Sequence, residues 1–240
     1  QSQHVQPMLT AAQRCAVEEF LRDFPKNEQL VLPERLSKQL LALAGFPVSV
    51  PVVAHTAMQA ADAAEAFGYP VALKVESYVI QHKTDVGGVR LGLQDRAAVK
   101  EAFLQMDSAM KRLDPSACVT VQPMAQSGFE VMLGAARLHD TPLMAAGMGG
   151  IYAEAFQDMA FRLAPLQEGQ AERMLQSLRC APVLNGFRTP PLDRAGVCQL
   201  LQRLSELMQA FAQIREVDLN PCRVYENGCA ILDARIVLQL

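Results

Sequence analysis

The chain has 240 residues, of which half are apolar and 20% are charged, and its net charge is −3 at neutral pH. This balance argues against a general nucleic-acid surface, which would need a basic excess, and no apolar run approaches the roughly 18 residues of a membrane-spanning helix. The polar N-terminus predicts no export signal. Six cysteines scattered without metal-site spacing indicate reduced thiols in a cytoplasmic protein.

The first half of the chain predicts alternating helices and strands. Each helix is marked at its start by a capping residue or a proline, and two of them end at a glycine. The predicted helices run from Thr10 to about Phe24, Pro33 to Gly45, Thr56 to Gly68 and Asp95 to Leu113. Apolar or alternating runs predict strands at 46–54, 70–75 and 89–93.

The second half predicts hairpin-connected strands with helices between them. The predicted strands are 118–124, 129–136, 142–147, 216–225 and 230–238, and the predicted helices are 168–178 and 193–212. Hairpins combined with intervening helices are typical of an α+β fold, here in two lobes. We therefore expect an N-terminal helical extension at 1–32, a first lobe at 33–121 and a second lobe at 122–240.

One lysine interrupts an otherwise apolar strand. Lys74 lies within Pro70–Val75, whose other residues predict a strand buried on both faces. A buried ammonium is costly unless it meets an opposite charge, and phosphate is the obvious candidate. The alternative is a lysine at a strand end, with its stem on the core and its ammonium in water.

The loop after this strand combines a histidine, a lysine and two glycines. His82 is a candidate nucleophile and Lys83 is a second cation, while Gly87 and Gly88 allow the backbone to form an anion-binding nest. Together with Lys74, the loop indicates a protein that binds a nucleotide and transfers a phosphoryl group. The alternative is a surface hairpin with an incidental histidine.

Three polar residues near the C-terminus are predicted to share one face of a hairpin. Asp218 and Asn220 point the same way along one strand, and a turn at Asn227–Gly228 would bring Asp233 beside them. Such oxygen donors suit Mg²⁺, because phosphate and water complete its coordination shell. The alternative is a solvated strand face. A glycine run at 147–150 follows an apolar strand and could let a nucleotide or a neighbouring strand come close.

These motifs, in this order, resemble the ATP-grasp family. More narrowly, they resemble the ATP-grasp subunit or domain of the ADP-forming acyl-CoA synthetases, relatives of succinyl-CoA synthetase. The resemblance covers about residues 33–240. The motifs are Gly-Tyr-Pro-Val-Ala-Leu-Lys at 68–74, His-Lys-Thr-Asp-Val-Gly-Gly-Val at 82–89, Gly-Met-Gly-Gly-Ile-Tyr at 147–152, Phe-Arg-Leu-Ala-Pro-Leu at 161–166, Val-Asp-Leu-Asn-Pro at 217–221 and Leu-Asp-Ala-Arg at 232–235.

The resemblance implies a fold in which two α+β lobes clasp ATP. Lys74 matches the lysine that binds the nucleotide phosphates. The segment from Gln122 to Met124 matches the interlobe backbone that reads adenine, and Glu130 matches a ribose contact. Gln157 departs from the family, which commonly has a lysine there.

The resemblance also assigns the chemistry. Asn220 and Asp233 match Mg²⁺ ligands, and His82 matches a histidine that takes the phosphoryl group. Asp218 matches an acid that steadies the incoming phosphohistidine of a partner domain. The expected cofactors are therefore ATP or ADP and Mg²⁺.

Two signatures of such synthetases are absent from the sequence, namely a CoA-binding Rossmann domain and a domain carrying the first phosphohistidine. We therefore expect this chain to act in a hetero-oligomer with an α-type subunit, or as one domain of a fused protein. One alternative is a nucleotide-sensing regulatory module, as in fusions with protein lysine acetyltransferases. Another is an ATP-binding scaffold without acyl chemistry.

Overall fold

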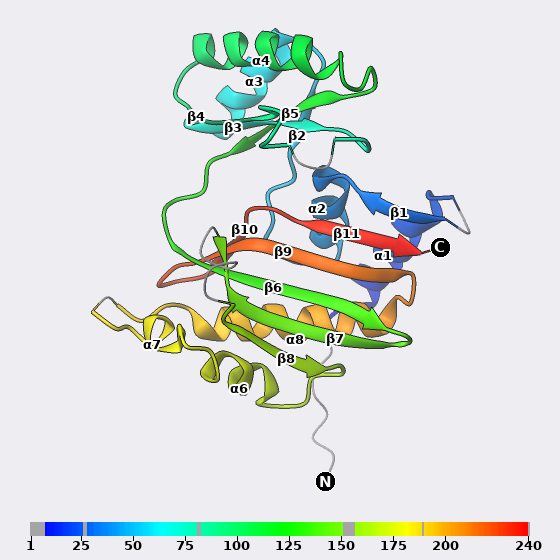
Figure 1. The fold of residues 1–240 in the computed structure, drawn as a ribbon, viewed down its shortest axis with the longest axis vertical. Coiled ribbons are helices and arrows are strands. Elements are labelled where there is room, and N and C mark those ends of the chain that lie inside the picture. Colours follow the sequence, from blue (N-terminus) through cyan, green and yellow to red (C-terminus); the bar gives the residue numbers. More distant parts are fainter. Residues whose placement is uncertain (1–7, 26–27, 81–82, 151–156, 189, 240) are drawn as a thin grey trace. The chain divides into compact units, whose positions relative to one another are not determined.

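The computed structural model describes residues 8–25, 28–80, 83–150, 157–188 and 190–239 (Figure 1). The chain divides into two compact units. Unit 1 comprises Gln1–Val31, Leu40–Val48 and Ser127–Leu240, and unit 2 comprises Leu32–Gln39 and Ser49–Gln126. Both units contain helices and strands, which confirms the predicted α+β class. The functional lobes at 1–32, 33–121 and 122–240 stay a prediction.

Unit 2 is a four-stranded antiparallel sheet in the order β2-β5-β3-β4, with two helices on one face (Figure 1). The strands are β2 (Val52–Ala54), β3 (Val71–Glu76), β4 (Val89–Leu93) and β5 (Cys118–Pro123). The helices are α3 (Ala57–Phe67) and α4 (Arg96–Met110), and the start of α2 (Glu34–Leu43) also belongs to this unit.

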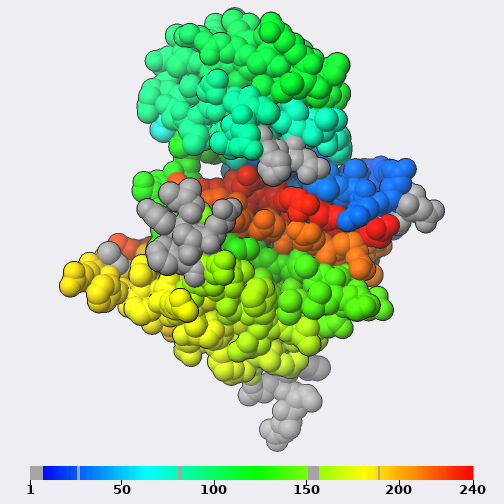
Figure 2. Space-filling view, in the orientation of Figure 1, coloured from blue at the N-terminus to red at the C-terminus, as the bar shows by residue number. Residues whose placement is uncertain are grey.

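The core of unit 2 lies between the sheet and these two helices. Val71 and Leu73 of β3 are fully buried in one cluster with Val99 and Phe103 of α4. In the space-filling view, the elements from β2 to α4 form the part of the surface coloured from cyan to green (Figure 2). Because side chains alternate along a strand, Lys74 lies on the other face of β3 from Leu73. That second face is also buried, as the sequence predicted.

Unit 1 is built on a seven-stranded sheet. Six strands follow the order β1-β11-β9-β6-β7-β8, and β10 pairs with β9. The strands are β1 (Gln29–Leu32), β6 (Phe129–Leu138), β7 (Thr141–Met148), β8 (Met159–Leu163), β9 (Ile214–Val224), β10 (Cys229–Ile231) and β11 (Arg235–Gln239). The helices are α1 (Ala11–Arg22), α6 (Gln170–Gln176), α7 (Ala181–Leu184) and α8 (Arg194–Ala210).

One face of the unit 1 sheet packs against α8. The helix buries Leu200, Leu204 and Leu207 at helical spacing, and it contacts β6, β7 and β9. The opposite sheet face carries Asp218, which is the register partner of Gly134 on β6 and of Arg235 on β11. Helix α8 therefore leaves that face to the polar residues of β9.

The N-terminal helix is anchored within unit 1. Thr10 and Gln13 form the predicted capping box at the start of α1. Glu206 of α8 pairs with Arg14 and accepts the backbone N–H of Leu9. None of the described helices is long and apolar enough to cross a membrane.

Several predicted elements require correction. Strands β1 and β8 and the short helix α7 were not predicted, and the expected strand at 46–54 is reduced to β2, since Pro47 and Pro51 interrupt it. The expected last strand at 230–238 is two strands, β10 and β11. The break lies opposite Pro221, which has no backbone N–H to donate to a continuous ladder.

Candidate functional site

The buried Lys74 meets a carboxylate of its own chain. Lys74 is 9% exposed, and its Nζ lies 2.7 Å from Oε1 of Glu34 at the start of α2. Sequence analysis proposed phosphate as the opposite charge and did not single out Glu34. The structure thus provides an internal counter-ion for this lysine, 40 residues away along the chain.

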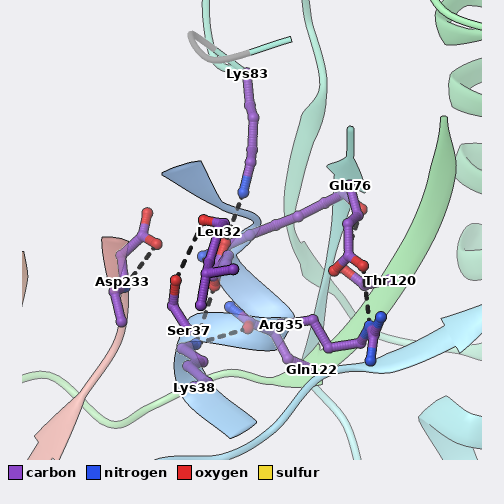
Figure 3. A network of polar contacts seen from close by, with 12 residues as sticks. Leu32, Arg35, Ser37, Lys38, Glu76, Lys83, Thr120, Gln122 and Asp233 are labelled. Carbon is purple, nitrogen blue, oxygen red and sulfur yellow. Dashed lines mark hydrogen bonds and ion pairs between the residues drawn. The ribbon is translucent and has the colours of Figure 1, made fainter. Parts of the chain in front are cut away.

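Two further lysines contact the same carboxylate. Lys38 Nζ lies 3.0 Å from Glu34 Oε1, one helical turn further along α2. Lys83 Nζ lies 3.0 Å from Glu34 Oε2, and its side chain extends from its loop toward the start of α2 (Figure 3). The lysine cluster, defined here as Glu34, Lys38, Lys74 and Lys83, therefore brings three ammonium groups onto one carboxylate.

The cluster strongly favours the ionised form of Glu34. Burial by itself would raise the pKa of Glu34, but the charges of Lys74, Lys38 and Lys83 and the hydrogen bond from Lys74 outweigh it and lower the pKa to about 2. Glu34 is therefore a carboxylate at every physiological pH. Lys74 and Lys83 each have further ammonium N–H groups that phosphate oxygens can accept, which makes the region a candidate phosphate site.

Gln122 and Met124 belong to the same unit. Gln122 is the register partner of Ala72 on β3, and its Oε1 accepts a 3.0 Å hydrogen bond from Lys38 (Figure 3). The backbone N–H of Met124 donates to the carbonyl of Pro70 at 3.1 Å. A hydrogen-bonded path thus links Gln122 through Lys38 to Glu34.

The two loop glycines pack tightly in the structure. Gly87 has a φ of +71°, as expected for a residue that allows a positive φ. A Cβ on Gly88 would lie 2.5 Å from Val75 Cγ1. The N–H groups of Gly87 and Gly88 donate to the carbonyls of Thr84 and Lys83, so they close the loop on itself. The anion-binding nest stays a prediction, and His82 lies outside the described residues.

In unit 1, Asp218 is a carboxylate with an unsatisfied oxygen. Its Oδ1 is buried and has no hydrogen-bond partner among the described residues. Burial raises the pKa of Asp218, and the nearby charges of Glu216 and Asp233 raise it further, while Arg235 opposes them. Arg235 forms its ion pair with Glu216, at 2.6 Å. Asp218 is therefore a strained acid that a cation or a proton donor would relieve.

Asn220 and Asp233 lie close to Asp218, as the sequence predicted, but Asp233 does not lie on a strand. It lies in the break between β10 and β11, where the N–H of Leu232 donates to the carbonyl of Pro221 at 3.0 Å. Asn220 Oδ1 accepts the N–H of Gly150 at 3.2 Å. Asp218 and Asn220 thus lie in the middle of β9 and Asp233 lies in the break between β10 and β11, while the face that the three would share stays a prediction.

Glu130 and the glycine run adjoin this region. Glu130 accepts a hydrogen bond from Arg223 Nε at 3.0 Å. A Cβ on Gly150 would lie 2.1 Å from the Glu130 carboxylate, and one on Gly149 would lie 2.5 Å from the backbone of Val131. Of the two readings left open for this run, the described residues show close approach of a neighbouring strand.

The donor chemistry of this region fits Mg²⁺. Carboxylate and amide oxygens are its preferred protein ligands, and few are needed when phosphate oxygens are present. Within the described ranges, no group of three or more His, Cys, Asp or Glu side chains is arranged to hold a metal ion. Of the two proposed ligands, Asp233 is a carboxylate and Asn220 is an amide. The remaining ligands of a Mg²⁺ ion would therefore come from nucleotide and water.

Comparisons with known proteins identify the family. The model of the ATP-grasp domain matches residues 23–238. The β subunit of acetate–CoA ligase (ADP-forming) I from Pyrococcus furiosus is 32% identical over 89% of this chain and 93% of its own length. The 4-hydroxybutyrate–CoA ligase (ADP-forming) of Nitrosopumilus maritimus is 36% identical, over 89% of this chain but 32% of its own length.

Solved structures agree with this relationship. Acetyl-coenzyme A synthetase 1 from Ca. Korarchaeum cryptofilum, in complex with coenzyme A, Ca-AMPCP and HgCl⁺, has a TM-score of 0.84 and 31% identity, over 95% of this chain and all of that one. Its complex with coenzyme A and Mg-AMPPCP has a TM-score of 0.78 and 30% identity, with the same coverage, and its phosphohistidine segment points towards the nucleotide-binding site.

The chain therefore belongs to the ATP-grasp family, and it is related over most of its length to the β subunits of ADP-forming acetate–CoA ligases. The family and the predicted ATP-grasp fold are confirmed. The chain spans about a third of the length of the first curated relatives that it matches, with shares of 32%, 30% and 29%. In those relatives, the other two thirds lie outside the region that this chain matches.

Sequence analysis missed two residues of the lysine cluster, Glu34 and Lys38. A signal was available, because they are four residues apart on a predicted helix and both would face the same way. The two are buried, at 6% and 2% exposure, although Glu and Lys are rarely buried without a partner. The contacts of Glu34 with Lys74 and Lys83 are long-range in sequence, and no local pattern predicts them.

Proposed function

We propose that this chain is the ATP-binding, phosphoryl-transferring component of an ADP-forming acyl-CoA synthetase. The net reaction converts an acid, CoA and ATP into acyl-CoA, ADP and phosphate, and it is reversible. CoA binding and the first phosphohistidine belong to an α-type subunit or a fused domain, with which this chain forms a hetero-oligomer in the cytoplasm. The share of about a third of several relatives supports such a partner.

The observation that carries the proposal is that the chain has a cationic cluster in one unit and an acidic group of residues in the other. The chain is also similar to a β subunit over 89% of its length. Unit 2 offers the lysine cluster, with the ammonium groups of Lys74 and Lys83 for phosphates. Unit 1 offers Asp218, Asn220 and Asp233, with an unsatisfied buried oxygen. Phosphoryl transfer needs both cations on the phosphate oxygens and acids that hold a metal or a nucleophile.

Nucleotide binding is assigned to residues of both units. Lys74 and Lys83 bind the phosphates, and the Gly87–Gly88 backbone lies beside them. The backbone from Gln122 to Met124 contacts adenine, and Glu130 contacts the ribose. Lys74→Ala and Glu130→Ala should both weaken ADP binding in a calorimetric titration, whereas only Lys74→Ala should weaken tripolyphosphate binding.

Asn220 and Asp233 would hold Mg²⁺ together with the nucleotide phosphates. The ion would neutralise charge on the oxygens of the transferring phosphoryl group. In a titration with ADP, Mg²⁺ should tighten binding to the wild type and should have little effect on Asp233→Ala. Equal Mg²⁺ dependence of the two proteins would refute this ligand assignment.

His82 is the proposed phosphoryl acceptor. A neutral imidazole nitrogen attacks the γ-phosphorus of ATP, the P–N bond forms as the bond to the leaving ADP oxygen breaks, and the ring proton is released. The phosphoryl group then moves to a histidine of the partner, whose ring Asp218 orients. Each transfer exchanges one P–O or P–N bond for another, so no further reactant is needed.

Labelling tests the function directly. With γ-labelled ATP and the partner subunit, the wild type should acquire an acid-labile, base-stable label, and His82→Ala should acquire none while it retains ATP binding. His55→Ala is the matched control, because His55 lies at the start of α3 in the same unit. If the proteins bound ATP but none of them acquired label, the catalytic proposal would be overturned in favour of the nucleotide-sensing module. Equal labelling of His82→Ala would show that another residue carries the phosphoryl group.

A further inference from the structure

The lysine cluster has an inner and an outer part. The side chains of Lys38 and Glu34 are 2% and 5% exposed, whereas those of Lys74 and Lys83 are 11% and 18% exposed. Glu34 therefore lies behind the two outer lysines rather than in front of them. An anion that arrives from solvent meets Lys74 and Lys83 first.

The two oxygens of Glu34 divide the outer lysines between them. Oε1 accepts from Lys74 at 2.7 Å, and Oε2 accepts from Lys83 at 3.0 Å. Two ammonium groups that converge on one point repel each other, and in a buried site little solvent screens that repulsion. The bridging carboxylate makes their convergence favourable. Lys83 lies on a loop, and its bond to Glu34 Oε2 directs its side chain toward the cluster.

The bridge leaves donors for a ligand. An ammonium has three N–H groups, and the bond to Glu34 uses one of those on Lys74. The remaining donors can reach phosphate oxygens without displacing the carboxylate. Lys38, which bonds both Glu34 and Gln122, fixes the carboxylate from the inner side.

We propose that Glu34 is a positioning residue that holds Lys74 and Lys83 together as a two-lysine clamp for the phosphates of the nucleotide, an inference that rests on the function proposed above. Glu34 binds no phosphate itself. It sets the spacing and direction of the two cations before the ligand arrives, which lowers the cost of ordering them on binding.

An amide cannot replace this carboxylate. In Glu34→Gln, the side chain keeps one acceptor oxygen, and its NH₂ group faces the other lysine donor-to-donor. One of the two outer lysines therefore loses its contact. If Glu34 merely competed with phosphate for the lysines, the same substitution would instead tighten anion binding, because a negative charge disappears from the site.

Titration calorimetry with tripolyphosphate distinguishes these outcomes. We expect Glu34→Gln to weaken binding about tenfold, the loss of roughly one charged hydrogen bond. Glu34→Asp keeps two oxygens on a shorter arm and should recover part of that loss. Glu76→Gln is the matched control, since Glu76 lies on β3 two residues from Lys74, is 9% exposed and pairs with Arg35 instead of a lysine. It should change the affinity less than about twofold.

A double-mutant cycle tests whether Glu34 acts through Lys83. Lys83→Met should weaken tripolyphosphate binding, and adding Glu34→Gln should then cost less than it does in the wild type. Three results would overturn the clamp. Glu34→Gln could bind tripolyphosphate as tightly as the wild type or more tightly, or Glu34→Asp could bind it as weakly as Glu34→Gln. The losses of affinity in Glu34→Gln and Lys83→Met could also simply add in the double mutant. Should Glu34→Gln fail to fold, unchanged binding by Lys83→Met would overturn it. A wild type that binds neither tripolyphosphate nor Mg-ADP would instead overturn the proposed function.

Discussion

Two buried carboxylates of this chain, Glu34 in unit 2 and Asp218 in unit 1, have opposite surroundings. In unit 2, one carboxylate is surrounded by three ammonium groups, and both of its oxygens have partners. In unit 1, Asp218 lies near Glu216 and Asp233, and one of its oxygens has no hydrogen-bond partner in the part of the chain that the structure describes. The first arrangement stabilises itself, whereas the second depends on something outside the fold.

This difference indicates how each region would meet a ligand. A cluster that carries its own counter-ion can hold its cations in place before phosphate arrives. An unsatisfied buried acid has no counter-ion to hold it in place before its ligand arrives. Such acids are common where a metal ion or a reacting group binds. The cationic region should therefore contribute to the stability of the fold, and the acidic region should reduce it.

The largest expected effect is on the stability of unit 2. Glu34→Gln removes the carboxylate charge that Lys74 and Lys83 both contact, and breaking a buried ion pair from one side costs about 3–5 kcal/mol. Urea unfolding at pH 7 should show this loss, and Glu76→Gln should lose less because its amide oxygen can still accept from Arg35. A loss below that of Glu76→Gln would contradict the view that the cluster stabilises itself.

The same comparison predicts a dependence on pH. The pKa of Glu34 is lowered from its ordinary 4.5 to about 2 in the folded chain. Its stabilisation is therefore complete above about pH 4.5 and is lost as the pH falls toward about 2. The difference in unfolding free energy between the wild type and Glu34→Gln should shrink through this window. If the difference in unfolding free energy stayed constant between about pH 4.5 and about pH 2, the lysines would not be lowering the pKa of Glu34.

Lys74→Ala tests the ligand side of the cationic region. It removes one charged hydrogen-bond donor and should weaken ATP binding by about 1.5–3 kcal/mol. Lys100→Ala on α4 is a suitable control, because it removes a lysine of the same unit outside the cluster. Unchanged calorimetric affinity in Lys74→Ala would separate the cluster from nucleotide binding.

Sequence reasoning was most successful where the determinants are local. Thr10 and Gln13 predicted the start of α1 through side chains three residues apart. The apolar residues of Pro70–Val75 predicted burial on both faces of β3, and Lys74 is the charged residue within that run. The family motifs then predicted the fold, because their order along the chain is specific.

The remaining features depend on contacts between distant residues. Nothing near Lys74 in the sequence indicates that Glu34 is its partner. The position of Asp233 also required the structure, since the missing N–H of Pro221 on the neighbouring strand divides the last strand in two. Both features are set by residues far away in the sequence, Glu34 for Lys74 and Pro221 for Asp233.

Gly88→Ala tests whether the loop beside the cluster is held by packing. An added methyl group would meet the side chain of Val75 at 2.5 Å, and overpacking of this kind typically costs about 1–3 kcal/mol. Thermal unfolding without nucleotide should show the loss. In a Val75→Ala background the same substitution should cost clearly less, because the clashing methyl group is gone. An equal cost in both backgrounds would assign the requirement for glycine to something other than this contact.

The smallest and most specific effect concerns Asp218. Because its pKa is raised in the folded chain, the folded state holds the proton more tightly than the unfolded state, so the carboxylate costs stability at neutral pH and ceases to do so in acid. Asp218→Asn should therefore stabilise the chain by about 1 kcal/mol at pH 7, a rise of roughly 2–4 °C in Tm, and the gain should vanish near pH 3. Asp140→Asn, on the turn between β6 and β7, is the control for a change in net charge alone. The same Asp218→Asn protein should lose phosphoryl exchange with the partner, since the amide no longer supports a positively charged imidazole. A variant that is less stable than the wild type at pH 7 would show that the fold already satisfies this acid.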